Sequence, residues 1–247
     1  MKLAIGTANF QNKYGLLGTS IVGKKKITEI KKELKKNNIS FLDTSFEYNN
    51  LDIRFFPKKN NLKIITKIKL PKLERKKFIN NLHNMVESEL KRIKKKNFEA
   101  ILLHDSRDLN STIGINFLKE VKKLKKNKLT KKIGVSIYNP IELKKIFSRF
   151  TPDIIQAPLN VFDKRILFSK FLKNKKKKII LQVRSIFLQG LLLQNIKKIK
   201  NLKLNRKLKS KLVEFDDLCK KNKSTKLEQS INFILNQQKV DIITFGI

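Results

Sequence analysis

The chain has 247 residues, of which 40% are hydrophobic, and its 58 Lys and Arg against 20 Asp and Glu give a formal net charge of +38. This apolar content is enough for a sizeable core and excludes a wholly disordered chain. No apolar run approaches the roughly 20 residues of a membrane-spanning helix, and the first residues reach glycine too soon for a signal peptide. The single cysteine, Cys219, excludes an internal disulfide. We therefore expect a cytoplasmic protein that does not insert into a membrane.

The positive charge is spread along the chain. Lysine runs occur at residues 24–26, 94–96 and 175–178. A basic chain can bind nucleic acid or an anionic membrane surface. However, neither zinc-finger spacing nor an aromatic RNA-binding run accompanies these lysines. We therefore expect solvated lysine faces, and we regard a nucleic-acid partner as the less favoured alternative.

Short apolar runs alternate with longer amphipathic stretches. The runs are rich in Ile, Leu and Val, which is typical of strands that are buried on both faces. Strands are expected at residues 3–6, 41–43, 64–67, 101–104, 133–136, 154–158, 179–184 and 242–246. Between most of them, apolar residues recur at spacings of three and four, as on one face of a helix. Helices are expected at residues 27–36, 74–95, 114–124, 141–150, 164–172, 208–221 and 226–235.

This alternation predicts an α/β fold, a (β/α)8 TIM barrel that forms a single domain over residues 1–247. A doubly wound sheet is the alternative, but it would need a Gly-rich turn after the first strand, and residues 6–10 contain one glycine. Residues 44–63 include Pro57 and two asparagine pairs, so we expect the second helix to be short or absent.

The eighth helix is expected to be missing, because the last expected strand ends one residue before the end of the sequence. The outer face of strands 8 and 1 would then be partly bare. Leu3, Ile5, Ile243 and Phe245 are the candidates for an exposed apolar patch there. A patch of this kind favours self-association.

Polar residues lie where the expected strands end. In a parallel barrel these carboxyl ends converge on one mouth, where active sites form. The residues concerned are Asp43, Lys67, His104, Ser136 and Gln156, with Tyr48 on the loop after the second strand. Lys69 takes the place of Lys67 if the third strand is displaced by two residues.

The acid, lysine, tyrosine and histidine together predict a proton-transfer site. The ordinary pKa of a phenol is about 10, and a neighbouring ammonium lowers it. A carboxylate can pair with that ammonium, while a histidine can orient a carbonyl group or share the proton. No pair of His or Cys residues has metal-ligand spacing, so we expect no metal. His83, inside an amphipathic stretch, is interpreted as a surface residue.

The sequence resembles the aldo-keto reductase superfamily in seven segments that follow one another in the family's order. Residues 41–48, FLDTSFEY, look like the strand-2 motif Asp-Thr-(x)3-Tyr. Residues 65–67 are similar to the strand-3 lysine motif, and residues 101–104 to the strand-4 histidine motif. Later matches lie at residues 134–136, 156–160 and 184–192. The opening residues 6–10 resemble the short branch of the family, some members of which are found near surface-polysaccharide biosynthesis genes.

The resemblance implies reduction of a small-molecule aldehyde or ketone, sugar-like metabolites included, with NADPH as the cofactor. Tyr48 would be the general acid, and Asp43, Lys67 and His104 would complete the catalytic tetrad. The cofactor-binding residues that it implies are Ser136 and Gln156 on the nicotinamide carboxamide, Gly6 and Thr7 along the cofactor, and Arg184 and Ser185 at the ring-stacking and pyrophosphate-side positions.

Two departures from the family pattern concern the cofactor. Ile137 follows Ser136, where many members have an asparagine that also holds the carboxamide. The family's site for the adenosine 2′-phosphate follows strand 8, where this sequence has no residues. We therefore expect weak NADPH binding with little preference over NADH. The alternative is a catalytically impaired or non-catalytic barrel of the same family.

Overall fold

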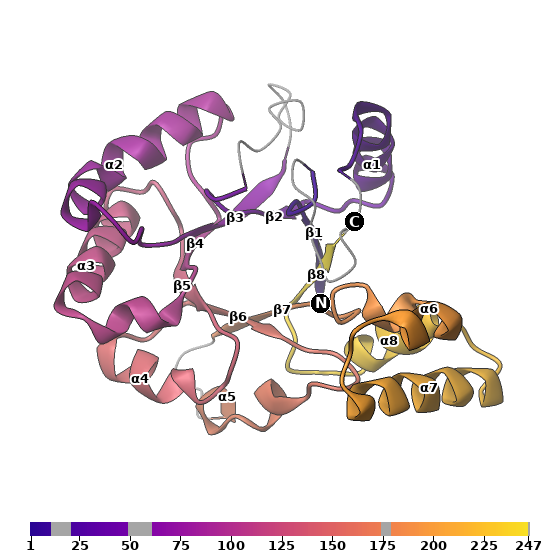
Figure 1. Cartoon of the computed structure of the whole chain (residues 1–247). Helices are drawn as coiled ribbons and strands as arrows, with labels where there is room; N and C mark the ends of the chain where they lie inside the picture. The colour runs from indigo at the N-terminus through magenta and orange to yellow at the C-terminus, as the bar shows by residue number, and fades with distance from the viewer. Residues whose placement is uncertain (11–20, 49–60, 174–178, 247) are drawn as a thin grey trace.

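The computed structural model describes residues 1–10, 21–48, 61–173 and 179–246. Eight parallel strands close into a barrel that is surrounded by helices (Figure 1). The strands are β1 (Lys2–Gly6), β2 (Phe41–Asp43), β3 (Lys63–Ile68), β4 (Ala100–Leu103), β5 (Ile133–Ser136), β6 (Ile154–Pro158), β7 (Ile180–Arg184) and β8 (Ile242–Gly246). Each strand pairs with the next one in sequence, and β8 pairs with β1 to close the barrel. The predicted (β/α)8 fold is confirmed.

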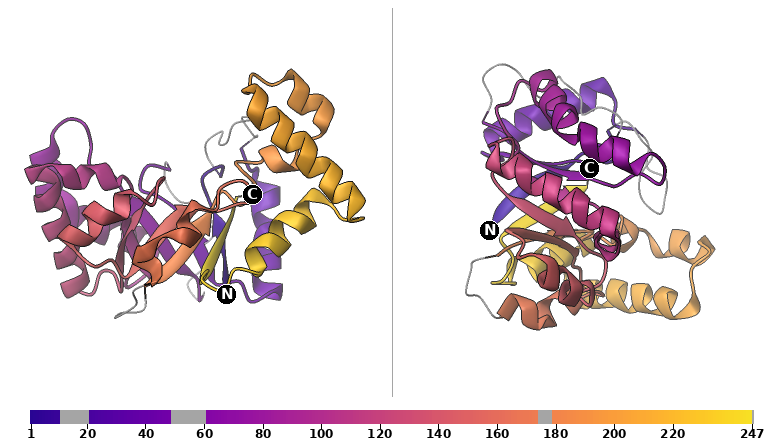
Figure 2. Two further views of the ribbon diagram at one scale, coloured as in Figure 1. Left: turned by 90° about the horizontal axis from the view of Figure 1, so that it is seen from below. Right: turned by 90° about the vertical axis from the view of Figure 1, so that its left-hand side faces the viewer.

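The helices lie outside the ring of strands. They are α1 (Lys24–Lys36), α2 (Arg75–Arg92), α3 (Thr112–Lys126), α4 (Glu142–Arg149), α5 (Lys170–Lys173), α6 (Ile196–Asn201), α7 (Arg206–Lys221) and α8 (Lys226–Leu235). Helices α6 and α7 stand away from the barrel on one side (Figure 2) and pack around a small core of their own that includes Leu212 and Phe215. Among the described residues, no helix is both long enough and apolar enough to cross a membrane.

The prediction of a single helix at residues 164–172 is wrong. The segment instead forms a 3₁₀ turn, Arg165–Phe168, followed by the short helix α5. Ser169 separates them in an extended conformation, with φ −66° and ψ 122°. Serine is disfavoured inside helices because its hydroxyl competes for backbone hydrogen bonds. The strand expected at residues 101–104 is also displaced, since β4 ends at Leu103 and His104 lies just beyond it.

The expected apolar patch next to β1 and β8 is wrong as well. Ile5 and Ile243 are 9% and 1% exposed. Leu3 and Phe245 are half-buried against the main core, which also contains apolar residues of α1. The apolar side chains on the outer face of β1 and β8 therefore belong to the main core. The expectation of a reduced second helix falls largely on residues 49–60, which lie outside the described residues.

Side chains along each strand alternate between the barrel interior and the outer face that packs on the helices. The interior contains an apolar cluster made of Ala4, Phe41, Ile65, Ala100, Leu102, Ile154 and Ile242. Two positions after four of these residues come Asp43, Lys67, Gln156 and Thr244, all of them buried. Because alternate residues of a strand face the same side, these polar groups come together at the carboxyl end of the barrel, directly above the apolar cluster.

Gly134 in β5 is packed too closely to accept a side chain. A Cβ atom added there would lie 2.1 Å from the Ile154 carbonyl oxygen and 2.8 Å from Leu102 Cδ2. Because the first contact is with backbone of the neighbouring strand, we expect Gly134→Ala to lower the free energy of unfolding by about 1–3 kcal/mol. Urea denaturation would measure this loss. Gly246→Ala is the control, since nothing lies within 4 Å of its Cβ position, and equal losses for both variants would contradict the packing.

Candidate active site

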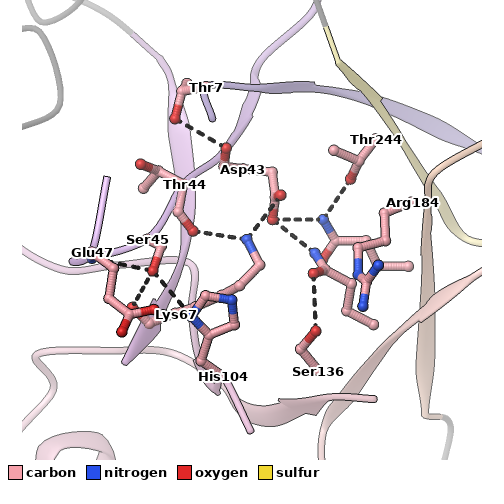
Figure 3. A network of polar contacts seen from close by, with 12 residues as sticks. Thr7, Asp43, Thr44, Ser45, Glu47, Lys67, His104, Ser136, Arg184 and Thr244 are labelled. Atoms are coloured by element: carbon pink, nitrogen blue, oxygen red, sulfur yellow. Dashed lines mark hydrogen bonds and ion pairs between the residues drawn. The ribbon is translucent and has the colours of Figure 1, made fainter. Parts of the chain in front are cut away.

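A buried ion pair joins the ends of β2 and β3. Lys67 Nζ donates to Asp43 Oδ2 over 2.9 Å and to the Thr44 carbonyl oxygen over 2.8 Å (Figure 3). Lys67 is 2% exposed and Asp43 5%. Burial lowers the pKa of the Lys67 ammonium, Asp43 opposes this, and the positive charge of Arg184 adds to the lowering. Lys69, the alternative lysine, is exposed beyond the end of β3.

The second oxygen of Asp43 accepts two amide hydrogen bonds. Gln156 Nε2 lies 2.8 Å and Gln182 Nε2 3.1 Å from Asp43 Oδ1. Gln182 Nε2 also lies 2.8 Å from Thr244 Oγ1. The carboxylate therefore binds one ammonium and two amides, which fix the position of the acid at the mouth.

Gln182 and Thr244 are members of the site that sequence reasoning missed. A signal was present for the glutamine, because it stands in the otherwise apolar run of β7 and is buried with no exposure. It also lies opposite Gln156 in the β6–β7 register. A polar residue within an apolar strand indicates a hydrogen-bond partner in the barrel.

Tyr48 lies half-buried on the turn that follows β2. Lys67 Nζ is 5.7 Å from the centroid of its ring. The His104 ring lies edge-on to it, with the centroids 6.4 Å apart and the planes at 85°. Two backbone bonds hold the turn: Phe46 N donates to the Lys67 carbonyl oxygen, and Tyr48 N donates to that of Ser45. The structure thus brings the four residues of the expected tetrad to one mouth.

His104 contacts a carboxylate that the sequence analysis did not single out. Its Nδ1 is 2.9 Å from Glu47 Oε2 and 3.4 Å from Ser45 Oγ. Burial and the nearby Lys67 lower the pKa of His104, and Glu47 opposes them. The only sequence signal for this contact was the place of Ser45 and Glu47 inside the same short turn as Tyr48.

Ser136 and Gln156 present neighbouring polar side chains at the mouth. They lie opposite each other in the β5–β6 register, and Ser136 Oγ donates to Gln156 Oε1 over a long 3.4 Å. One N–H of Gln156 is directed to Asp43, which leaves a second donor, and the Ser136 hydroxyl keeps its acceptor capacity. Ile137 is fully buried and brings no polar group to this position.

Unmet hydrogen-bonding capacity is also concentrated at the mouth. Within the described ranges, three buried side-chain atoms have no hydrogen-bond partner, namely Thr44 Oγ1, Gln182 Oε1 and Ser230 Oγ. Two of the three belong to residues that bind Asp43 or Lys67. Since buried polar atoms are rarely left unsatisfied, their position favours a polar ligand at this end of the barrel.

Gly6 and Thr7 lie at the end of β1, beside Asp43. A Cβ atom on Gly6 would lie 3.3 Å from Thr244 Cγ2, so glycine allows the close approach of β8. Thr7 N and Oγ1 both donate to the Asp43 carbonyl oxygen, over 3.0 and 3.3 Å. The Thr7 hydroxyl therefore helps to hold the end of β2 in place.

Arg184 ends β7 at the opposite side of the mouth. Its guanidinium lies 4.5 Å from the ring centroid of Tyr138 and donates to the Ile137 carbonyl oxygen over 3.2 Å. Ser185, the next residue, has a φ of 56°, and its carbonyl oxygen accepts from Asn160 Nδ2. The left-handed backbone at Ser185 turns the chain sharply away from the strand. The Arg184 guanidinium therefore lies over the exposed Tyr138 ring, a contact typical of arginine.

The model of the Aldo/keto reductase family matches residues 2–247. Among solved structures, the aldo-keto reductase AKR11C1 from Bacillus halodurans in its holo form is similar at a TM-score of 0.76 and 17% identity, over 100% of this chain and 82% of that chain. The glycerol dehydrogenase AKR11B4 from Gluconobacter oxydans is similar at a TM-score of 0.71 and 18% identity, over 99% and 82% of the two chains. At these levels of sequence identity, the similarity to the solved structures shows a shared fold alone. No curated protein sequence gives a match. Because the family model spans nearly the whole length, the chain belongs to the aldo/keto reductase family.

Proposed function

We propose that the protein reduces an aldehyde or ketone to the alcohol with NADPH or NADH, and that Tyr48 donates the proton. The observation that carries this proposal is the buried Lys67 ammonium, held by Asp43 at 2.9 Å and lying 5.7 Å from the centre of the Tyr48 ring. Burial of an ammonium has a large desolvation cost that an ion pair offsets only in part, so its presence at the mouth favours a functional role. Membership of the aldo/keto reductase family supports the same reaction.

The protein's part in this reaction is to position the carbonyl and to supply the proton. The reduced nicotinamide supplies the hydride to the carbonyl carbon. As the electron pair of the carbonyl bond moves to oxygen, the Tyr48 hydroxyl gives its proton to that oxygen and the alcohol forms. Lys67 stabilises the phenolate that remains, because its positive charge lies close to the Tyr48 ring. The Asp43 carboxylate and its amide partners keep Lys67 in place.

The residues that would hold the nicotinamide end of the cofactor belong to β5, β6 and β7. Ser136 and Gln156 would bind the carboxamide, and Arg184 would stack on the ring. His104 would contact the carbonyl oxygen from the β4 side. Gly6, Thr7 and Ser185 would flank the rest of the cofactor, although the Thr7 hydroxyl already binds the Asp43 carbonyl oxygen.

The experiment has two stages. Titration of the protein with NADPH, and separately with NADH, followed by nicotinamide fluorescence, should give saturable binding. A panel of aldehydes and ketones, sugar aldehydes included, should then cause loss of the reduced cofactor's absorbance. Saturable binding without turnover on any carbonyl would favour the non-catalytic barrel of the same family. Absence of binding to both cofactors would overturn the proposal.

A further inference from the structure

Glu47 is an acidic residue at the mouth that the proposed reaction leaves without a role. Its Oε2 lies 2.9 Å from His104 Nδ1, and the two side chains are 47% and 19% exposed. Ser45 Oγ lies 3.4 Å from the same nitrogen (Figure 3). The Ser45 hydroxyl donates its proton to the Lys67 carbonyl oxygen over 3.3 Å. Ser45 Oγ can therefore only accept a hydrogen bond from the His104 ring. His104 Nδ1 is thus directed at two acceptors.

This environment decides which nitrogen of His104 carries the proton. An ionised carboxylate can only accept a hydrogen bond. His104 therefore keeps its proton on Nδ1 in both the neutral and the charged imidazole, and Nε2 is the nitrogen that gains or loses a proton. In Figure 3 the second ring nitrogen points away from Glu47, toward the inside of the mouth.

The charged groups that act on His104 come from two segments. Lys67 in β3 and Lys69 just after it lower the pKa of His104, in addition to the larger effect of burial, while Glu47 on the turn after β2 opposes them. Among the described residues, the titratable Tyr48 ring also contacts His104.

Asp105, the neighbour of His104 in the chain, is directed elsewhere. Its carboxylate binds Arg107, with Arg107 Nη2 2.5 Å from Asp105 Oδ2. Within the part of the chain that the structure describes, the negative charge that favours the imidazolium form of His104 comes from Glu47.

The backbone of the turn fixes Glu47 for this contact. Glu47 N donates to Ser45 Oγ over 3.3 Å, and Phe46 N donates to the Lys67 carbonyl oxygen over 3.0 Å. Glu47 also immediately precedes Tyr48, so one short turn carries both the carboxylate and the proposed proton donor. A change in the position of this turn would affect both groups together.

We propose that Glu47 is a positioning residue, which holds His104 with its proton on Nδ1 and leaves Nε2 as the nitrogen that faces the mouth. His104 then offers Nε2 to the mouth as an acceptor when neutral and as a donor to the carbonyl oxygen when charged. The role in the reaction rests on the proposed reductase function. The position of the proton on the His104 ring does not depend on that function, and it can be measured without turnover.

Titration of the two histidines by NMR on 15N-labelled protein tests the proposal. The chain contains His83 and His104 only, so His83→Asn assigns the signals. In Glu47→Gln we expect the titration midpoint of His104 to fall by about half to one pH unit, because a partly exposed opposite charge is lost. The fraction of neutral His104 that is protonated on Nδ1 should fall too. Glu47→Asp should restore part of both.

The chain offers a matched control in a second Glu–His pair. His83 Nε2 lies 3.3 Å from Glu87 Oε1 on the surface of α2, with side chains 41% and 40% exposed. Glu87→Gln removes the carboxylate of this surface pair and should leave His104 unchanged. If His104 keeps its midpoint and its tautomer in Glu47→Gln, the proposal is wrong.

A second measurement addresses the reaction. With carbonyl reduction established, the acid limb of the kcat/KM profile of Glu47→Gln should shift by the same amount as the NMR midpoint, with the Kd for NADPH unchanged. A uniform loss of activity at every pH would point to a merely structural role. If the protein reduces no carbonyl at all, the NMR result still decides the state of His104, so the two proposals fail separately.

Discussion

Asp43→Leu is expected to lower the free energy of unfolding by about 3–5 kcal/mol, the usual cost of leaving one member of a buried ion pair without its partner. Among the described residues, the substitution leaves the Lys67 ammonium with the Thr44 carbonyl oxygen as its hydrogen-bond partner. Gln156 and Gln182 also lose the oxygen to which they donate. For a chain of this length, the loss corresponds to a decrease in Tm of roughly 10 °C. Chemical denaturation and calorimetry would measure both quantities.

The double variant Asp43→Leu/Lys67→Met distinguishes the loss of stability caused by the unpaired Lys67 charge from the loss caused by altered packing. Because it removes both charges, we expect it to be more stable than Asp43→Leu alone. Glu29→Gln, which breaks the exposed pair with Lys26, should cost less than about 0.5 kcal/mol. Additive losses in the double variant would show that Asp43 and Lys67 do not depend on each other.

The stability deficit of Asp43→Leu should shrink as the pH is raised. Asp43 raises the pKa of Lys67, so its removal leaves burial and Arg184, both of which lower that pKa. Between the lowered value and the ordinary 10.5, the unfolded chain binds a proton that the folded chain does not. The free energy of unfolding therefore rises with pH across this window. Denaturation of the variant and of the wild type at neutral pH and near pH 10 would test whether the difference between them shrinks.

Strand positions and strand-end residues are the part of the molecule that the sequence predicts well. Buried parallel strands appear as short Ile, Leu and Val runs, and β2, β5, β6 and β8 lie at the expected residues. Once the strands close into a barrel, their ends must meet, so Asp43, Lys67 and His104 come together whatever the loops do. This part of the site follows from the strand period and the topology alone.

Other parts of the site depend on contacts that one sequence does not specify. Gln182 binds Asp43 across 139 positions of the chain. A buried glutamine indicates that a partner exists, but not which one. The Glu47–His104 contact depends on the detailed turn after β2. The failed helix at residues 164–172 has a similar origin, because its apolar spacing suited a helix while Ser169 interrupts it.

Tyr48→Phe is expected to reduce the turnover number for carbonyl reduction by about 10²–10⁴, the range typical of general acid catalysis. The ring remains, so its contacts with Lys67 and His104 should persist. The Kd for NADPH and the Tm should therefore stay near the wild-type values.

The measurement is steady-state reduction of the best carbonyl from the panel, with the cofactor titration repeated on the variant. Because the hydroxyl takes part only as the carbonyl oxygen becomes charged, its loss should reduce kcat and kcat/KM by the same factor. A change in KM alone would mean that the Tyr48 hydroxyl binds the substrate without giving up its proton. Turnover equal to that of the wild type would assign the proton to another group, and His104, whose ring contacts Tyr48 at the same mouth, would be the first candidate.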